Sequence, residues 1–120
     1  MKKTLVLGAS EKTDRYANIA VRRLQDKDVP VVAHGYKEGS INGTPIITDF
    51  PNASEDFHTV TLYLSAKNQK QYYDDIVSLS PERVIFNPGT YNDELEAILK
   101  DNNISFEHAC TLVMLSADTY

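Results

Sequence analysis

Five short apolar runs alternate along the 120-residue chain with stretches whose apolar residues recur at helical spacing. This alternation constrains the fold more than any other feature of the sequence. Each run is short enough to be a strand and shows little polar alternation, which is typical of strands buried on both faces of a sheet. The runs occupy residues 3–9, 29–35, 58–65, 83–89 and 104–109. We therefore expect an α/β fold: a doubly wound parallel sheet of about five strands, with helices on both faces.

Three stretches between the runs have apolar residues at the spacing of an amphipathic helix. They cover residues 15–27, 67–79 and 92–101. The first stretch should bury Ile19, Ala20, Val21 and Leu24, and Asp14 is expected to be its N-cap.

Two segments lie outside this pattern. Residues 38–52 are rich in Gly, Pro, Asn and Ser, so we expect a loop, with at most a short strand around Ile46 and Ile47. Residues 110–120 are expected to form either a short last helix or an extended tail. The sequence has no internal repeat and no long linker, so residues 1–120 should form one domain.

Composition argues against several functional classes. The net charge of −5 makes general binding to nucleic acid unexpected, and no stretch approaches the roughly 20 apolar residues of a membrane helix. The lysines and short apolar run at residues 2–9 are followed at once by charged residues, unlike a signal peptide. A single cysteine allows no internal disulfide and suits a reducing compartment. We expect a cytoplasmic protein.

Charge is unevenly distributed along the chain. Residues 1–40 contain eight basic and five acidic residues, a net charge of +3, and residues 41–120 carry −8. Two explanations remain open at this point. The charges belong to solvated helix faces, or the first third of the chain faces a small anionic ligand.

The loop after the first run contains the strongest candidate site. Ligands of such sheets bind at the carboxyl ends of the strands, which here selects residues 8–16, 33–37, 63–67 and 87–91. Residues 8–16 read "GASEKTDRY": Gly8 allows close backbone approach, and Lys12 and Arg15 add positive charge. Helix-start amides also favour an anion, so the loop predicts a phosphate site rather than an ordinary turn with two surface cations.

The loop does not match the usual dinucleotide fingerprint. A G-x-G-x-x-G motif would need glycine at Ser10 and Thr13, and only Gly8 fits. The second run is followed by Lys37 instead of the carboxylate that binds the ribose hydroxyls of NAD. A lysine suits a ribose phosphate, which both NADP and coenzyme A (CoA) carry. NAD is therefore disfavoured, and NADP and CoA both remain.

Several segments resemble the small single-domain CoA-binding proteins of bacteria, over nearly the whole chain. The resemblance rests on the order and spacing of "LVLGAS", "RYANIAVRRL", "VVAHGYKEGSINGTPI", "RVIFNPGTYNDE" and "ACTLVML". The fold of that family is similar to the amino-terminal, Rossmann-like domain of the succinyl-CoA synthetase alpha subunit. Two departures are Asp28, where relatives commonly have glycine, and "HGY", where many have Asn-Pro.

The resemblance implies a site for CoA or an acyl-CoA. It implies diphosphate contacts, with Lys12 adding charge, at Gly8, Ala9, Ser10, Arg15 and Tyr16. It implies an adenosine with its 3′-phosphate near Gly35, Tyr36 and Lys37. The ligand would then pass Leu64, Ser65, Asn87, Pro88 and Gly89.

The expected function is a binding module with no assigned reaction and no catalytic residue. The phosphorylated histidine of succinyl-CoA synthetase lies in a separate domain, which 120 residues do not contain. The alternatives are an NADP-binding oxidoreductase-like or sensor domain, and a protein-interaction domain. The expected partner is a small-molecule nucleotide ligand, and the sequence does not identify a protein partner.

His34, His58 and His108 lack metal-ligand spacing, so no metal is expected. Cys110 has no evident catalytic partner. It is expected to be a packed core residue or, alternatively, to lie near the thiol end of CoA.

Overall fold

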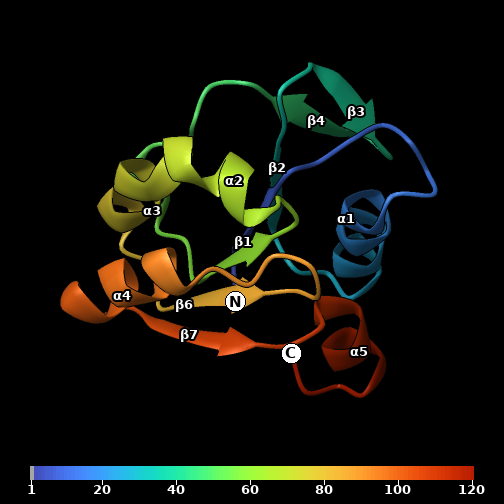
Figure 1. The fold of residues 1–120 in the computed structure, drawn as a ribbon. Helices are drawn as coiled ribbons and strands as arrows, with labels where there is room; N and C mark the ends of the chain where they lie inside the picture. The colour runs from blue at the N-terminus through green and yellow to red at the C-terminus, as the bar shows by residue number, and fades with distance from the viewer. Residues whose placement is uncertain (1) are drawn as a thin grey trace.

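The computed structural model describes residues 2–120 and contains one seven-stranded sheet covered by helices (Figure 1). The strands are β1 (Thr4–Leu7), β2 (Val31–His34), β3 (Gly39–Ile41), β4 (Thr44–Ile47), β5 (Thr59–Leu62), β6 (Arg83–Phe86) and β7 (Ser105–His108). Their order is β3-β4-β2-β1-β5-β6-β7, and all neighbours are parallel except β3 and β4. The predicted α/β class is confirmed.

The sheet has seven strands where about five were expected. The two additional strands, β3 and β4, form an antiparallel hairpin in the segment that was predicted to be mainly loop. The expected short strand at residues 46–47 is the end of β4, which pairs with β2. The hairpin turns at Asn42 and Gly43, which both have positive φ. Strand β3 has only three residues and begins with glycine, so it shows no apolar run that would reveal it.

The helices are α1 (Tyr16–Asp26), α2 (Ala66–Gln69), α3 (Tyr73–Leu79), α4 (Asp93–Asp101) and α5 (Thr111–Ser116). A short 3₁₀ helix spans Ala53–Glu55. The predicted single helix over residues 67–79 is wrong in one respect, since a 3₁₀ turn at Lys70–Tyr72 separates α2 from α3. Residues 110–120 form a short last helix, α5, followed by a tail.

Helix α1 differs from expectation at its start. Its N-cap is Arg15 rather than Asp14, and no side chain of residues 2–120 forms a capping hydrogen bond there. After the helix ends, Asp28 has a φ of 57°, in the left-handed region that glycine adopts without strain. This conformation explains why glycine also suits that position.

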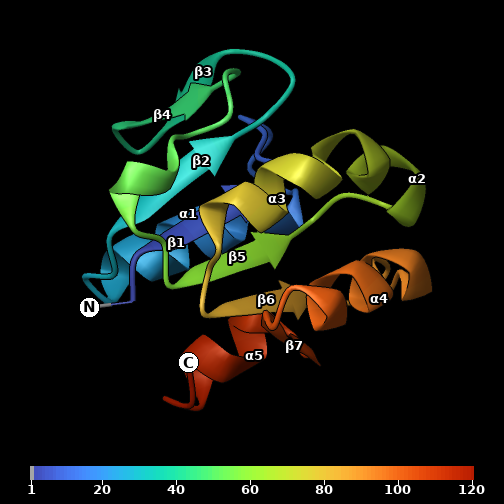
Figure 2. The same ribbon diagram turned by 90° about the vertical axis from the view of Figure 1, so that its left-hand side faces the viewer.

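The core consists of two layers, one on each face of the sheet. Figures 1 and 2 show α1 and α5 on one face and α2, α3 and α4 on the other. Successive residues of β1 alternate between the layers: Leu5 and Leu7 pack with α3 and α4, whereas Val6 packs with α1 and α5. Because helices cover both faces, the side chains on both faces of the central strands are buried and mostly apolar.

The chain changes direction across the sheet at β1. From β1 it continues through α1 to β2 on one side, and after the β3–β4 hairpin it returns to β5 on the other side of β1. Connections therefore leave the carboxyl ends of β1 and β5 in opposite directions. Such a switch point leaves an open crevice between the two loops.

Candidate functional site

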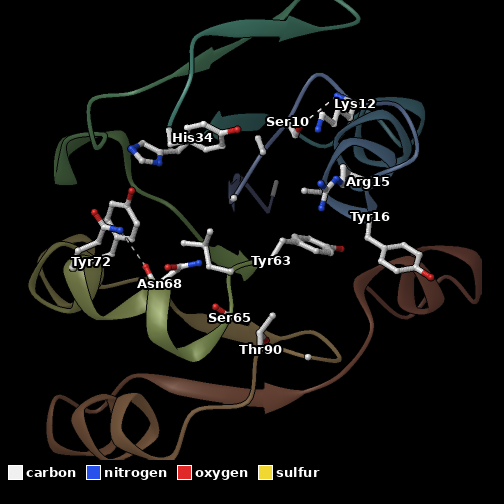
Figure 3. Close-up of a pocket in the computed structure, with 18 of the residues that line it drawn as sticks. Ser10, Lys12, Arg15, Tyr16, His34, Tyr63, Ser65, Asn68, Tyr72 and Thr90 are labelled. Atoms are coloured by element: carbon white, nitrogen blue, oxygen red, sulfur yellow. Dashed lines mark hydrogen bonds between the residues drawn. The ribbon is translucent and has the colours of Figure 1, made fainter.

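A cavity of about 530 Å³ opens at the carboxyl ends of β1, β2, β5 and β6, at this switch point (Figure 3). Its walls come from the loops after these strands, from the start of α1 and from the α2 segment. The lining residues are Gly8, Ala9, Ser10, Lys12, Arg15, Tyr16, Ala17, His34, Gly35, Tyr36, Tyr63, Leu64, Ser65, Asn68, Gln71, Tyr72, Pro88, Gly89 and Thr90.

All the expected site residues line this cavity except two, Lys37 and Asn87. The structure brings together Gly8, Ala9, Ser10, Lys12, Arg15, Tyr16, Gly35, Tyr36, Leu64, Ser65, Pro88 and Gly89. Lys37 is exposed and lies outside the lining. That any of these residues binds a ligand stays a prediction.

Asn87 is buried, and its side chain holds α5 against the sheet. Its Nδ2 donates to Thr61 Oγ1 at 2.7 Å and to the Leu62 carbonyl at 2.8 Å. Its Oδ1 accepts a hydrogen bond from the backbone N–H of Thr111 at 2.9 Å. The amide is therefore fully used inside the protein, which assigns Asn87 a structural role.

The backbone of the loop after β1 is already bonded at its first two residues. The N–H groups of Gly8 and Ala9 both donate to the His34 carbonyl at 2.9 Å, so they are not free for an anion. Gly8 has a φ of 106°, and a Cβ there would lie 3.1 Å from Leu64. A Cβ on Gly35 would lie 2.4 Å from the Ala9 carbonyl oxygen. These two glycines let the loops after β1, β2 and β5 pack closely.

The start of α1 is electropositive and open to the cavity. In the described part of the chain no side chain caps it, and its first turn contains no acidic residue, which leaves the helix dipole uncompensated. Arg15 extends toward the cavity between Ser10 and Tyr63, and Tyr16 flanks it (Figure 3). Among residues 2–120, the ion pairs involve other cations, and neither Lys12 nor Arg15 takes part in one. This end of the cavity is suited to a phosphate or diphosphate.

His34, at the end of β2, lies beside Tyr72 at another part of the cavity (Figure 3). Its ring is 5.4 Å from Phe50 and 5.3 Å from Tyr72 between centroids. Burial lowers the pKa of His34 below its usual 6.5, so the ring is neutral at pH 7. Its Nε2 donates to the Thr48 carbonyl at 3.0 Å, and its buried Nδ1 has no partner within residues 2–120.

Tyr63 is a lining residue of the cavity, and its buried hydroxyl lies near Thr61 and Thr111, on the α5 side of the sheet. Its hydroxyl is buried and has no hydrogen-bond partner in the described part of the chain. Burial raises the pKa of Tyr63 to about 12, so the hydroxyl keeps its proton. His34 and Tyr63 were not predicted as site residues. Their positions at the carboxyl ends of two predicted strands were the sequence feature that could have identified them.

The walls after β5 and β6 are held together by Gln69, which is fully buried. Its Nε2 donates to the carbonyls of Leu64 at 2.8 Å and Thr90 at 2.7 Å. Its Oε1 accepts a hydrogen bond from Asn92 Nδ2 at 2.9 Å, and Asn92 also caps α4 through the N–H of Leu95. Gln69 thus links two loops that face the cavity. Sequence reasoning missed it because a polar residue in an amphipathic stretch is normally exposed.

The remaining candidates lie elsewhere. Cys110 is the half-buried N-cap of α5 and is not a lining residue of the cavity. No three His, Cys, Asp or Glu side chains of residues 2–120 form a cluster able to hold a metal ion. No helix in the same part of the chain has the length and apolar character needed to cross a membrane.

Comparison with solved structures gives close matches over the whole chain. The crystal structure of an uncharacterized protein is 49% identical, with a TM-score of 0.94, covering 100% of this chain and 98% of that one. The structure of "cell-free ID.343" from Thermus thermophilus is 18% identical, with a TM-score of 0.87. The match covers 99% of this chain and 90% of that one. A hypothetical protein of Pyrococcus horikoshii OT3 is 21% identical, with a TM-score of 0.88. The match covers 97% of this chain and 82% of that one. The two more distant proteins share the fold.

The family comparison agrees with the resemblance found in the sequence. No curated protein matches the chain. The family model described as a CoA binding domain matches residues 2–116, which is nearly the full length. This chain therefore belongs to the CoA-binding domain family.

Proposed function

We propose that this domain binds CoA or an acyl-CoA in the cavity at the carboxyl ends of β1, β2, β5 and β6, as a binding module without a reaction of its own. The observation that carries the proposal is the open start of α1, where Lys12 and Arg15 lie at the cavity. Within residues 2–120 the first-turn amides have no side-chain cap and these two cations form no ion pair. Membership of the CoA-binding family supports CoA as the source of the anion.

The diphosphate of the ligand would lie over the start of α1. Arg15 and the first-turn amides of the helix would bind it, and the Ser10 hydroxyl would donate a further hydrogen bond. Gly8 and Ala9 would contribute close packing only, because the His34 carbonyl already accepts their N–H groups. This differs from a glycine-rich loop, in which the backbone itself wraps the phosphates.

The adenosine would lie toward Gly35 and Tyr36, with Lys37 near the 3′-phosphate. Lys37 is exposed and outside the cavity lining, so its contact would be at the cavity mouth and weaker than that of Arg15. The pantetheine arm would pass Leu64, Ser65, Pro88 and Gly89, which line the far wall.

A thermal-shift comparison of CoA, acetyl-CoA, NAD and NADP tests the choice of ligand. A ligand at 100 times its Kd adds about 2.7 kcal/mol of stability, or about 10 °C in Tm for a domain of this size. CoA or acetyl-CoA should give the largest shift. An equal or larger shift with NADP would contradict the proposal and favour an NADP-binding domain.

Calorimetric titration with CoA and dephospho-CoA tests the residues. Arg15→Ala should weaken both ligands about 10-fold or more, because both contain the diphosphate. Lys37→Ala should weaken CoA several-fold and leave dephospho-CoA unchanged, since only CoA has the 3′-phosphate. Arg23→Ala is the matched control, because Arg23 is exposed on the same helix and outside the cavity lining. Equal weakening of both ligands by Lys37→Ala would show that the 3′-phosphate lies elsewhere.

A further inference from the structure

Glu11 is an acidic side chain in the middle of the loop that is proposed to bind an anion. Its neighbours Ser10 and Lys12 line the cavity, but Glu11 does not. Its Oε2 instead accepts a hydrogen bond from the backbone N–H of Ser40, on β3, at 3.0 Å. A carboxylate near a bound diphosphate is unfavourable by electrostatic repulsion, so its presence here calls for another role.

Gly39, next to Ser40, leaves the space that Glu11 occupies. A Cβ on Gly39 would lie 2.3 Å from Cδ and 2.6 Å from Cγ of Glu11. The glycines with positive φ are Gly8, Gly43 and Gly89, so Gly39 is not needed for its backbone conformation. What its missing side chain allows is the close approach of Glu11 to β3.

The β3–β4 hairpin is a firm anchor for this contact. Gln25 of α1 donates from Nε2 to the Ile41 carbonyl at 3.1 Å, the Asn42 carbonyl at 3.3 Å and Thr44 Oγ1 at 2.7 Å. Strand β4 also pairs with β2 inside the sheet. Figure 1 shows the loop between β1 and α1 passing beside β3, so Glu11 joins the two segments directly.

The same loop is tied to α1 on its other side. Asn18 Nδ2 donates to the Ser10 carbonyl at 2.8 Å, and Arg22 Nη2 donates to the Thr13 carbonyl at 2.9 Å. The bonds of Gly8 and Ala9 to His34 fix the first two residues of the loop to β2. Without the Glu11 contact, residues 10–14 would lose their tie to β3 and keep the contacts to α1. Lys12 and Arg15 would then lose part of their fixed position relative to the β2 side of the cavity.

We propose that Glu11 is a positioning residue, whose contact with Ser40 in the space left by Gly39 holds the loop so that Lys12 and Arg15 meet an anionic ligand. The proposal rests on the function proposed above for the identity of the ligand. Its central consequence is that the hydrogen-bonding capacity of Glu11 favours ligand binding, although its negative charge opposes it.

Three variants separate these two effects. Glu11→Gln keeps an acceptor oxygen and removes the charge, so it should bind CoA at least as tightly as the wild type. Glu11→Ala removes the acceptor, and Gly39→Ala displaces the side chain while keeping its charge. Each of these two should weaken CoA about 3- to 10-fold, the range for one net hydrogen bond. The double variant should be no weaker than either single variant, because both remove the same contact.

The affinities of these variants for CoA are measured by titration calorimetry, and either of two results would overturn the proposal. If Glu11→Gln and Glu11→Ala change the affinity equally, only the charge matters. If the losses of Glu11→Ala and Gly39→Ala multiply in the double variant, the two residues act independently. A loss caused by the missing contact should also persist in high salt, which screens charge repulsion.

Hydrogen exchange without ligand separates failure of this proposal from failure of the proposed function. Amides of residues 9–15 should exchange faster in Glu11→Ala and Gly39→Ala than in the wild type and Glu11→Gln. Faster exchange in a protein that does not bind CoA would uphold the positioning role and refute CoA as the ligand. Unchanged exchange and unchanged affinity in a protein that binds CoA would refute the positioning role.

Discussion

Replacement of Gln69 by methionine tests whether the buried amide holds the cavity walls together. The side chain is fully buried and makes three hydrogen bonds, to Leu64, Thr90 and Asn92. Methionine has a similar length but bonds to none of these groups. At about 1 kcal/mol for each net hydrogen bond, Gln69→Met should lower the free energy of unfolding by about 3 kcal/mol.

This loss converts to a measurable change in melting temperature. The unfolding entropy of a 120-residue domain is about 250 cal/mol/K near its Tm, so 3 kcal/mol corresponds to a decrease of about 12 °C. Circular dichroism melts and urea titrations of the same samples would give Tm and the free energy of unfolding.

The matched control is Lys70→Met, which places the same side chain at the next, exposed position. It should change Tm by no more than about 2 °C. If Gln69→Met also melts within about 2 °C of the wild type, the three hydrogen bonds add no net stability and the reasoning is refuted.

Two further predictions concern titration and covalent chemistry. The unfolded His34 takes up a proton near pH 6.5 and the folded one only at lower pH, so the free energy of unfolding should fall as the pH drops below about 6.5. Urea titrations across this range should show a smaller fall for His34→Phe, and an unchanged slope would contradict the buried, neutral ring. Cys110 is outside the cavity lining, so intact-mass spectrometry should show no CoA adduct after incubation with excess CoA disulfide. An added mass of one CoA, removed by reductant, would contradict this prediction and show that Cys110 is accessible to the thiol end of CoA.

The central strands were predictable because burial on both faces gives them an unmistakable apolar character. Strands β1, β2, β5 and β6 lie in the middle of the sheet and match the expected runs. Strand β3 was missed because it is a three-residue edge strand whose partner, β4, contains Pro45. The hairpin is held by backbone pairing, by the Gln25 hydrogen bonds and by burial of Ile41 and Ile46. Two separated isoleucines do not form the apolar run that marks a strand.

The break between α2 and α3 was likewise not predictable from the sequence. Ile76 and Leu79 are buried and Tyr72 is half-buried, as the helical spacing over residues 67–79 predicts. The 3₁₀ turn interrupts the α-helix without changing this spacing on the α3 side. Periodicity therefore indicates which face is buried but not whether the helix is continuous.

The position of the cavity was predictable, whereas the direction of individual side chains was not. Parallel strands place their carboxyl ends at one edge, which selects the right loops from the sequence. Asn87 follows β6 as expected, but its amide faces α5. In a strand covered on both faces there is no polar alternation that assigns a residue to one side, so His34 and Tyr63 could not be assigned either.

The single carbonyl of His34 that accepts two N–H groups limits how this domain can be re-engineered. Replacing Ser10 and Thr13 by glycine would complete the G-x-G-x-x-G motif in the sequence. The backbone N–H groups of Gly8 and Ala9 would still be bonded to the His34 carbonyl of β2. Conversion to a dinucleotide carrier would therefore require breaking the junction between β1 and β2, a change to the centre of the sheet rather than to its surface loop. In the proposed site, ligand choice would be more readily altered through Tyr16, Tyr36 and Lys37, which are exposed and lie outside the strands.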